Sequence, residues 1–281
     1  MAVRVITDSS ARLPAELCQR WAIRQVPLHI LVDGADLLDG VDQMPDDVFG
    51  CERATTAGPA PDELHTAYRQ ALADSGGDGV VAVHISSALS GTCGAAHRVA
   101  AEIGPAVQVV DSRSTAMATG FVALAAARAG AAGAGLDDVA ARARSAVPRT
   151  RAYIVVQRLD NLRRSGRIGS TAAWLGTALS LKPMLHIDDG KLMLAQRIRT
   201  FGKAVAAMTE RVCEVVADRP AAVAVHHVAN PDGAADLAAG LARRLPGCPP
   251  AVVTDLGPAL GLHVGAGALA VCVDLGDAAA P

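Results

Sequence analysis

The chain has 281 residues, 51% of them hydrophobic, which is enough to bury one large core or two medium ones. Its 26 Lys and Arg against 28 Asp and Glu give a formal net charge of -2, and it has 3 Phe, 2 Trp and 2 Tyr. Neither a basic field nor a base-stacking surface is available, so we exclude nucleic acid as a partner. The six cysteines are scattered without metal-ligand spacing, which predicts free thiols in a reducing compartment and no metal.

Two further features bear on location. The first ten residues lead directly into a strand-like run and a turn, without the apolar segment of an export signal. The longest charge-free apolar stretch, 256–273, contains Pro258, His263 and four glycines, which suits buried loop and strand better than a membrane helix. We therefore expect a soluble cytoplasmic protein.

Short β-branched runs alternate with Ala- and Leu-rich helical segments through the first half of the chain. The predicted strands begin near residues 3, 23, 79 and 107, and the predicted helices span 15–21, 62–73, 92–103 and 114–130. This alternation is typical of βαβ units, so it predicts a mainly parallel sheet with flanking helices.

The pattern changes after the Pro and basic residues at 147–150. A strand (YIVV), a charged helix and a hairpin with the turn Asp188-Asp189-Gly190 follow, and then two strands near 221 and 268 with a helix over 232–245 between them. A hairpin belongs to an antiparallel or mixed sheet. We therefore predict an α/β protein of two domains, with an N-terminal domain at 1–150 and a C-terminal α/β domain with a mixed or antiparallel sheet at 151–281.

The string S-S-A-L-S-G-T at Ser86–Thr92 follows a predicted strand and opens a predicted helix. Its hydroxyls and the free amides of the helix N-terminus are the groups that an anion site needs, and Gly91 would let the backbone approach a ligand closely. The alternative is an elaborate helix cap. T-D-S-S at Thr7–Ser10 has a similar position, but we interpret it first as turn and cap residues.

Two other segments contain candidate polar groups. T-T-A-G-P at 55–59 is an ordinary loop when taken alone, and His263 lies in what we expect to be a glycine-rich loop, where it is either positioned for function or structural. Ser90 and His263 could instead form a nucleophile and base, although the G-x-S-x-G elbow is missing because residue 88 is Ala88.

A basic segment, R-L-D-N-L-R-R-S-G-R-I at 158–168, is followed by Arg197 and Arg199 after the hairpin. Its positive charge could dock an acidic partner or hold a phosphate. The alternative is a solvated helix face stabilised by i,i+4 pairs.

In this order the strings TDSS, VPLHI, DGVD, ISSALSGT, VVDSRS, RLDNLRRSGRI and GLHVGAGALAV resemble the DegV family, whose well-studied members are the fatty-acid-binding subunits of bacterial fatty acid kinase. The resemblance implies two α/β domains, with the carboxylate of a long-chain fatty acid near the domain junction and its acyl chain in an apolar tunnel. We expect residues 151–281 to form the lipid-binding domain. It also implies a carrier that is not itself an enzyme and needs no cofactor, which presents the fatty acid to a separate kinase for acyl-phosphate formation and allows transient membrane contact.

The same resemblance implies the residues of the site. Carried over by motif, the carboxylate ligands are Thr56, Ser90 with the backbone of Gly91 and Thr92, and His263. Arg167 and Arg199 match positions associated with kinase docking or with the acyl-phosphate head. The family's T-S-Q-P-S and H-T-G-P-G strings are T-A-G-P-A and H-V-G-A-G here, which keeps Thr56 and His263 but changes their neighbours. The choice between Ser87 and Ser90 as head-group ligand stays open.

Two other functions compete with this one. The first is a serine-dependent esterase or thioesterase that uses Ser90 and His263, which turnover lost in a Ser90→Ala variant would identify. The second is a sensor of another small anionic metabolite, which a short closed pocket would favour.

Overall fold

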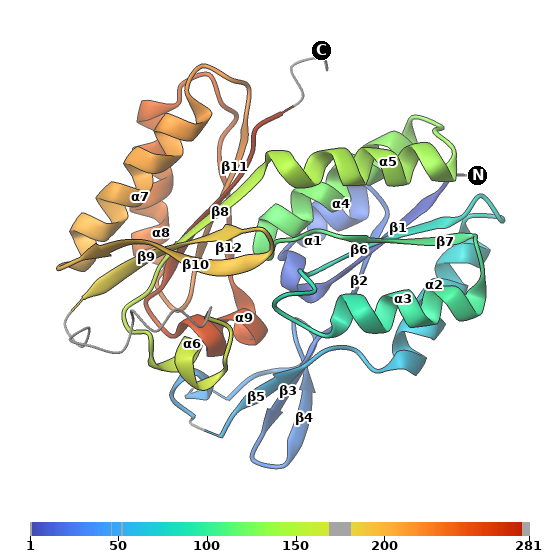
Figure 1. Ribbon diagram of the computed structural model, residues 1–281, viewed down its shortest axis with the longest axis horizontal. Coiled ribbons are helices and arrows are strands. Elements are labelled where there is room, and N and C mark those ends of the chain that lie inside the picture. Colours follow the sequence, from blue (N-terminus) through green and yellow to red (C-terminus); the bar gives the residue numbers. More distant parts are fainter. Residues whose placement is uncertain (1, 46, 52, 169–180, 277–281) are drawn as a thin grey trace.

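The structure is a computed structural model that describes residues 2–45, 47–51, 53–168 and 181–276. Two large sheets lie side by side with helices around them, and a small third sheet projects beside them (Figure 1). Within the described residues, no helix is both long and apolar enough to cross a lipid bilayer.

The first sheet is wholly parallel and is formed by strands that precede residue 150. Its order is β2-β1-β6-β7, made of β1 (Arg4–Asp8), β2 (Ile23–Val26), β6 (Val80–His84) and β7 (Val107–Asp111). Because alternate side chains point to opposite faces, Ile6 and Ala82 pack under one pair of helices while Val5 and Val81 pack under another. The first pair is α2 (Pro61–Asp74) and α3 (Thr92–Ile103), and the second is α4 (Ala116–Ala131) and α5 (Leu136–Ala146). The short α1 (Ala15–Arg20) joins β1 to β2.

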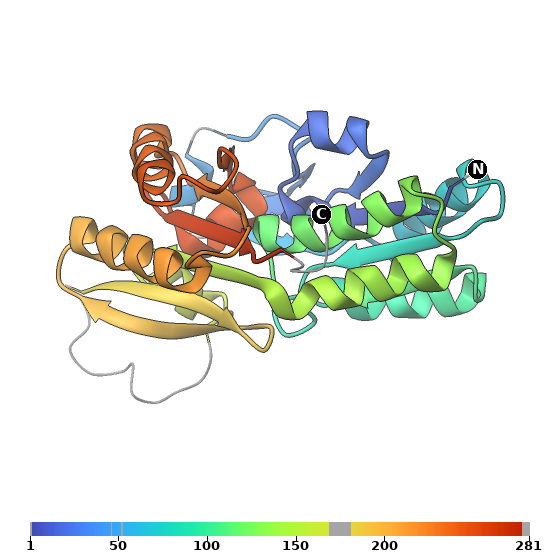
Figure 2. The same cartoon turned by 90° about the horizontal axis from the view of Figure 1, so that it is seen from above.

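The second sheet is mixed and follows residue 149. Its order is β10-β9-β8-β13-β11-β12, and of the pairs between described strands only β11 with β12 is parallel. The strands are β8 (Thr150–Val155), β9 (Lys182–Asp188), β10 (Lys191–Ile198), β11 (Ala222–His227), β12 (Val252–Asp255) and β13 (Leu269–Asp274). Helices α7 (Phe201–Val216) and α8 (Pro231–Arg244) cover its outer face (Figure 2).

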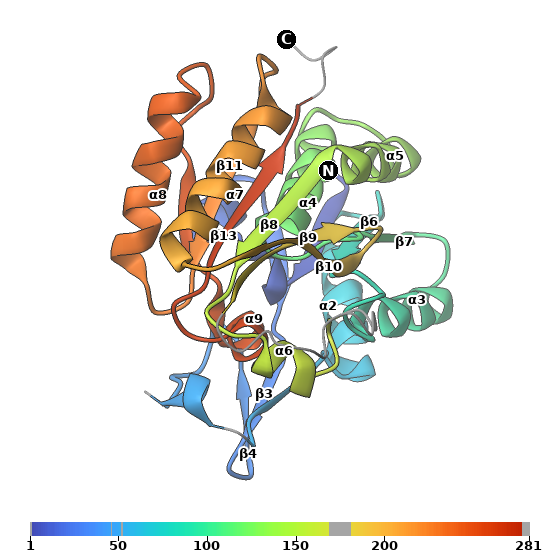
Figure 3. The same ribbon diagram turned by 60° about the vertical axis from the view of Figure 1, so that its left-hand side comes forward.

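Helix α4 connects the two halves of the core. It is apolar on all sides except for Arg128, so it can be buried all round, and it lies between the two sheets (Figure 3). One hydrophobic cluster therefore runs from Val5 and Val83 of the first sheet through Met117 to Ile154 and Cys272 of the second.

A small antiparallel sheet of order β4-β3-β5 lies apart from both large ones. It comprises β3 (His29–Val32), β4 (Ala35–Leu38) and β5 (Thr55–Ala57), and it packs against α9 (Gly257–Val264), which lies near α6 (Asp160–Arg164). Short 3-10 turns complete the chain at η1 (Ser9–Ala11), η2 (Val48–Gly50) and η3 (Val147–Arg149). This sheet matters because β5 carries Thr56 towards α9.

The predicted fold class is confirmed: a parallel sheet with flanking helices is followed by a mixed sheet. A strand does begin at Ile23 as predicted, but the apolar run there divides into β2 and β3, because Pro27 has no amide hydrogen to continue a ladder. Helices α5 and α7 and strand β12 were not predicted. The division into domains at 150 stays a prediction, although the strands of the two large sheets separate at that point.

Candidate ligand-binding site

A cavity lies where the first sheet, the small sheet and the inner face of the second sheet meet. Its volume is about 180 Å³, whereas one bound water needs roughly 10–15 Å³. Its walls come from segments far apart in the chain, including Leu28, Ile85, Ile154 and Leu256. The cavity is therefore much larger than a packing defect and can hold a small molecule.

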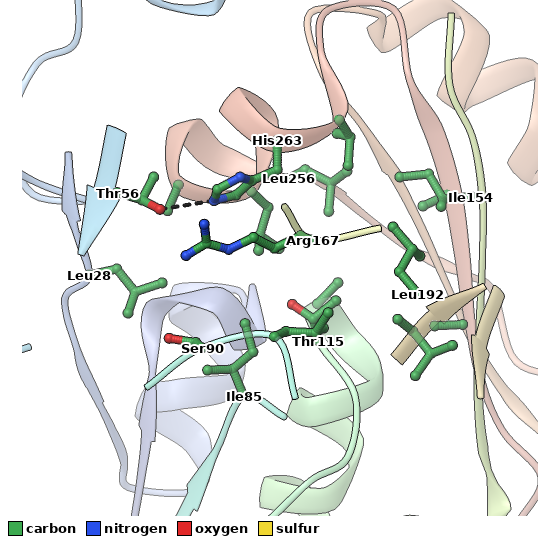
Figure 4. Close-up of a pocket in the computed structure, with 18 of the residues that line it drawn as sticks. Leu28, Thr56, Ile85, Ser90, Thr115, Ile154, Arg167, Leu192, Leu256 and His263 are labelled. Carbon is green, nitrogen blue, oxygen red and sulfur yellow. Dashed lines mark hydrogen bonds between the residues drawn. The ribbon is translucent and has the colours of Figure 1, made fainter. Parts of the chain in front are cut away.

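Most polar side chains of this cavity gather at one end, beside apolar Leu28, and Thr115 lies between that end and the apolar one. Thr56, His263 and Arg167 gather at one end with Ser90 nearby, whereas Ile154 and Leu192 form the other end (Figure 4). A molecule with a polar head and an apolar tail would match both ends at once, because a buried polar head needs hydrogen-bond partners and an apolar tail does not.

Thr56 and His263 form the central polar pair. Thr56 Oγ1 and His263 Nε2 are 2.9 Å apart, and His263 Nδ1 is buried without a hydrogen-bond partner among the described residues. Burial, helped by the positive charge of Arg167, lowers the pKa of His263 to about 4. The imidazole is therefore neutral at pH 7. In the tautomer with the proton on Nε2, the ring donates to Thr56 and leaves the threonine hydroxyl hydrogen free to donate into the cavity.

His263 lies in the last turn of α9 and not in the glycine-rich loop that we expected. Pro258 stands in the first turn of the helix, and Gly265, with φ of 82°, ends it. Gly261, inside the helix, is a close-packing position, since a Cβ there would collide with the ring of Phe49. The glycines therefore end and pack a helix, and this helix aims His263 at β5.

The loop between β6 and α3 presents Ser90 and not Ser87 to the cavity. Ser90 Oγ lies 2.9 Å from Thr92 Oγ1 and accepts a hydrogen bond from the Thr92 amide at 3.3 Å. Ser87 is exposed and donates to Asp111 Oδ2 at 2.6 Å. Gly91 also lines the cavity, whereas Thr92 is buried behind Ser90. Ser90 is thus both a cap for α3 and a hydroxyl of the cavity wall.

Close packing joins the Ser90 loop to the Thr56 segment. A Cβ on Gly58 would lie only 2.5 Å from Thr92 Oγ1, so the chain after Thr56 approaches α3 more closely than a larger residue would allow. The two hydroxyls predicted from separate motifs are therefore brought to the same cavity.

A buried network supports the end of β6 just before this loop. Asp8 Oδ2 accepts from the Ile85 amide at 2.9 Å and lies 2.9 Å from His84 Nδ1, while His84 Nε2 lies 2.7 Å from the Tyr68 hydroxyl. Burial acts to raise the pKa of Asp8, but the bonds from His84, Ser10 and Ile85 lower it overall. The T-D-S-S string therefore serves as turn and scaffold, because Asp8 fixes the strand end from which the Ser90 loop departs.

The two arginines of the basic segments have different places. Arg167 is exposed and lines the polar end of the cavity, whereas Arg199 is exposed and does not line it. His263 Nε2 is bonded to Thr56, and the Ser90 hydroxyl is bonded to that of Thr92, so the hydrogen bonds among the described residues do not pair Ser90 with His263. Across the described ranges, no group of three or more His, Cys, Asp or Glu could hold a metal ion.

The apolar wall was missed by sequence reasoning. It is formed by side chains of several strands and helices, among them Leu28, Ile85, Ile154, Ile187 and Leu192. In sequence these residues look like any others that pack in a core, because their shared cavity arises only when the sheets meet.

Comparisons with known proteins agree with this architecture. Residues 2–275 match the family model described as an uncharacterised protein of the DegV family. A DegV domain-containing protein of Mycobacterium tuberculosis (strain H37Rv) is 66% identical over 276 residues, which cover 98% of each chain. A solved DegV family protein from Thermus thermophilus, described by its fatty acid binding, is 29% identical with a TM-score of 0.88, covering 98% of this chain and 100% of that one. DegV from Bacillus subtilis, described as a fatty acid binding protein, is 29% identical with a TM-score of 0.87 and the same coverage. The chain therefore belongs to the DegV family.

Proposed function

We propose that this protein binds a long-chain fatty acid, with the carboxylate among Thr56, Ser90 and His263 and the acyl chain in the apolar part of the cavity. The observation that carries this proposal is that Thr56, Ser90, Arg167 and His263 gather towards one end of a cavity whose other end, at Ile154 and Leu192, is apolar. The fatty acid binding described for the relatives from Thermus thermophilus and Bacillus subtilis supports it.

The head group would be held by hydroxyls and not by a formal ion pair with histidine. Thr56 donates its hydroxyl hydrogen to one carboxylate oxygen, and His263 orients Thr56 through the 2.9 Å bond to its oxygen. Ser90 donates to the other oxygen, with the backbone at Gly91 and Thr92 close behind it. Arg167 contributes positive charge at the same end, which offsets part of the cost of burying the anion.

The tail would be recognised separately from the head. Each buried CH₂ group contributes about 0.8 kcal/mol, so an aliphatic chain gains most of its affinity from the apolar wall. The described wall has no Trp or Phe and is formed largely by Leu, Ile and Ala side chains. Such a wall fits a flexible hydrocarbon chain, and binding needs no chemical step.

The protein would act as a carrier without a cofactor that presents its fatty acid to a fatty acid kinase for acyl-phosphate formation. In this proposal Arg167 contacts the head group at the mouth of the cavity, and Arg199, outside it, contributes to docking of the kinase. The cytoplasmic location, transient contact with a membrane and the assignment of lipid binding to residues 151–281 stay predictions.

Mass spectrometry of freshly purified protein tests the proposal. The intact mass is measured under native and denaturing conditions, and the organic extract of the same sample is analysed for fatty acids. We expect close to one fatty acid per chain, bound in the native state and released on denaturation. Equal masses and an empty extract, together with no binding of added hexadecanoate, would overturn the proposal.

The esterase alternative makes a different prediction for the same preparation. An acyl ester or acyl thioester would be hydrolysed at a rate that Ser90→Ala abolishes, whereas a carrier shows no such turnover with or without Ser90. The bonds of Ser90 to Thr92 and of His263 to Thr56 favour the carrier.

A further inference from the structure

The tip of the β9–β10 hairpin forms the end wall of the apolar part of the cavity. Ile187 and Leu192 are paired across the hairpin, one pair away from the closing pair at its turn, and both line the cavity. Leu192 stands at the end opposite Thr56 and His263 (Figure 4). An acyl chain that starts at the polar end would therefore run towards this pair.

A second, larger cleft lies on the other side of the same wall. It is bordered by β7, by the chain after α5 and by the turn residues of the hairpin. Its volume is about 740 Å³. Ala152, Tyr153 and Ile187 border both spaces. Among the described residues, these three residues of β8 and β9 form the partition that the cavity and the cleft share.

Ile187 supplies most of the side-chain volume that the partition presents on the inner face of the second sheet, because Tyr153 belongs to the cluster on the outer face. The antiparallel register pairs Tyr153 with His186, and the next step of that register sets Ala152 opposite Ile187. Both residues belong to the cluster on the inner face of the second sheet. Alanine contributes a single methyl group, so the isoleucine side chain is the part of the wall that an acyl chain would meet.

The hairpin tip is held in place by contacts to the first sheet. Ser86 Oγ donates to the carbonyl oxygen of Gly190 at 2.8 Å, and Arg113 forms an ion pair with Asp189. Ser86 directly follows Ile85, which itself lines the cavity. Because the turn is anchored on the side of the cleft, the wall cannot recede without breaking these contacts.

We infer that Ile187, set against Ala152, determines the longest acyl chain that the protein accepts; this inference rests on the proposed fatty acid binding. In the wild type a chain that reaches Ile187 gains no further burial from additional CH₂ groups. Truncating Ile187 joins the cavity to the cleft and gives a longer chain a path forward.

The test is a series of affinities for saturated fatty acids from 14 to 22 carbons, measured by calorimetry on delipidated protein. In Ile187→Ala we expect the affinity for eicosanoate relative to hexadecanoate to rise about tenfold, the equivalent of roughly two newly buried CH₂ groups. Ala152→Val, which adds a bulkier side chain to the same face from the neighbouring strand β8, should shift the preference to shorter chains by a similar factor. Ile198→Ala is the matched control, since Ile198 lies on β10 and packs against the opposite face of the sheet.

The outcomes separate this inference from the proposed function. If the wild type binds none of the fatty acids, the proposed function fails. If the wild type binds them and Ile187→Ala, folded by its thermal melt, keeps the wild-type ratio, the inference alone is overturned. Should Ile187→Ala not fold, Ile187→Val and Ala152→Val decide the question, because an unchanged length preference in both would also overturn it.

Discussion

Thr56 Oγ1 and His263 Nε2 are 2.9 Å apart, although the two residues lie 207 positions apart in the chain. The small sheet delivers the threonine on β5, and α9, packed against that sheet, delivers the histidine. Burial holds the pKa of His263 at about 4, so the pair stays uncharged at neutral pH. The histidine therefore positions a hydroxyl and does not act as a cation for the ligand.

Thr56→Ala should weaken fatty acid binding about tenfold or more, because a hydrogen bond to a charged group contributes about 1.5–3 kcal/mol. The fold should survive, since β5 is a short strand at the edge of the small sheet. Calorimetric titration with hexadecanoate measures the effect. Thr55→Ala is the matched control, because Thr55 is the exposed neighbour on the same strand. Equal affinities for the two variants would remove Thr56 from the head-group site.

Ser90→Ala should also weaken binding by about tenfold, since it removes the second hydroxyl donor to the carboxylate. Ser87→Ala tests the alternative head-group ligand, and we expect it to leave affinity near the wild-type value because Ser87 bonds to Asp111 outside the cavity. Circular dichroism and thermal melting check that both variants keep the fold. A larger loss of affinity in Ser87→Ala than in Ser90→Ala would contradict this assignment.

The two arginines should differ in a binding assay. Arg167→Ala should lower hexadecanoate affinity several-fold, because the guanidinium lines the polar end of the cavity. Arg199→Ala should leave affinity unchanged, because that exposed side chain does not line the cavity. If a kinase partner docks on the surface that carries Arg167 and Arg199, both variants should slow acyl-phosphate formation. Loss of affinity in Arg199→Ala alone would refute the proposed division of roles.

His29 should make the stability of the fold dependent on pH. Its Nδ1 lies 2.7 Å from Asp36 Oδ1 and its Nε2 lies 2.8 Å from Glu63 Oε2, so it links β3 and β4 to α2. Burial acts to lower the pKa of His29, but the hydrogen bonds and charges of Glu63 and Asp36 raise it overall. A raised folded-state pKa gives stability that is complete below the unfolded pKa near 6.5 and is lost as pH rises through the folded value.

Urea denaturation between pH 5.5 and 9 checks this prediction. The difference in unfolding free energy between wild type and His29→Gln should be largest at pH 5.5 and shrink by roughly 1 kcal/mol at the upper end, a value kept small because both carboxylates are solvent-exposed. His97→Gln, an exposed histidine on α3, is the control and should show no such trend. A difference in unfolding free energy that stays constant with pH would refute the stabilisation of protonated His29 by Asp36 and Glu63.

The fold class was predictable from local patterns, although α5, α7 and β12 were not, and the polar end of the site was predictable in part. Ser90 stands directly after a strand and before a helix, so the short sequence around it already indicates an anion site. Thr56 looks ordinary in its own loop, and only the family resemblance connected it to Ser90. His263 was expected in a loop because glycines stand on both sides of it in the sequence. In the structure Gly261 lies inside a helix and packs against Phe49.

The apolar end could not be predicted for a physical reason. Ile154, Ile187 and Leu192 lie in apolar strand sequences like those of any core, and nothing local distinguishes a side chain that lines a cavity from one that fills a core. Their role depends on how the second sheet meets the first across α4. The break of one predicted strand into β2 and β3 likewise created the small sheet on which Thr56 depends.

A crystal structure of the delipidated protein with added hexadecanoate tests the central claim most directly. We predict a carboxylate within hydrogen-bond distance of Thr56 Oγ1 and Ser90 Oγ, with the acyl chain running between Ile154 and Leu192 towards Ile187. A carboxylate bound at the hairpin end, or an acyl chain bound outside this cavity, would contradict the account.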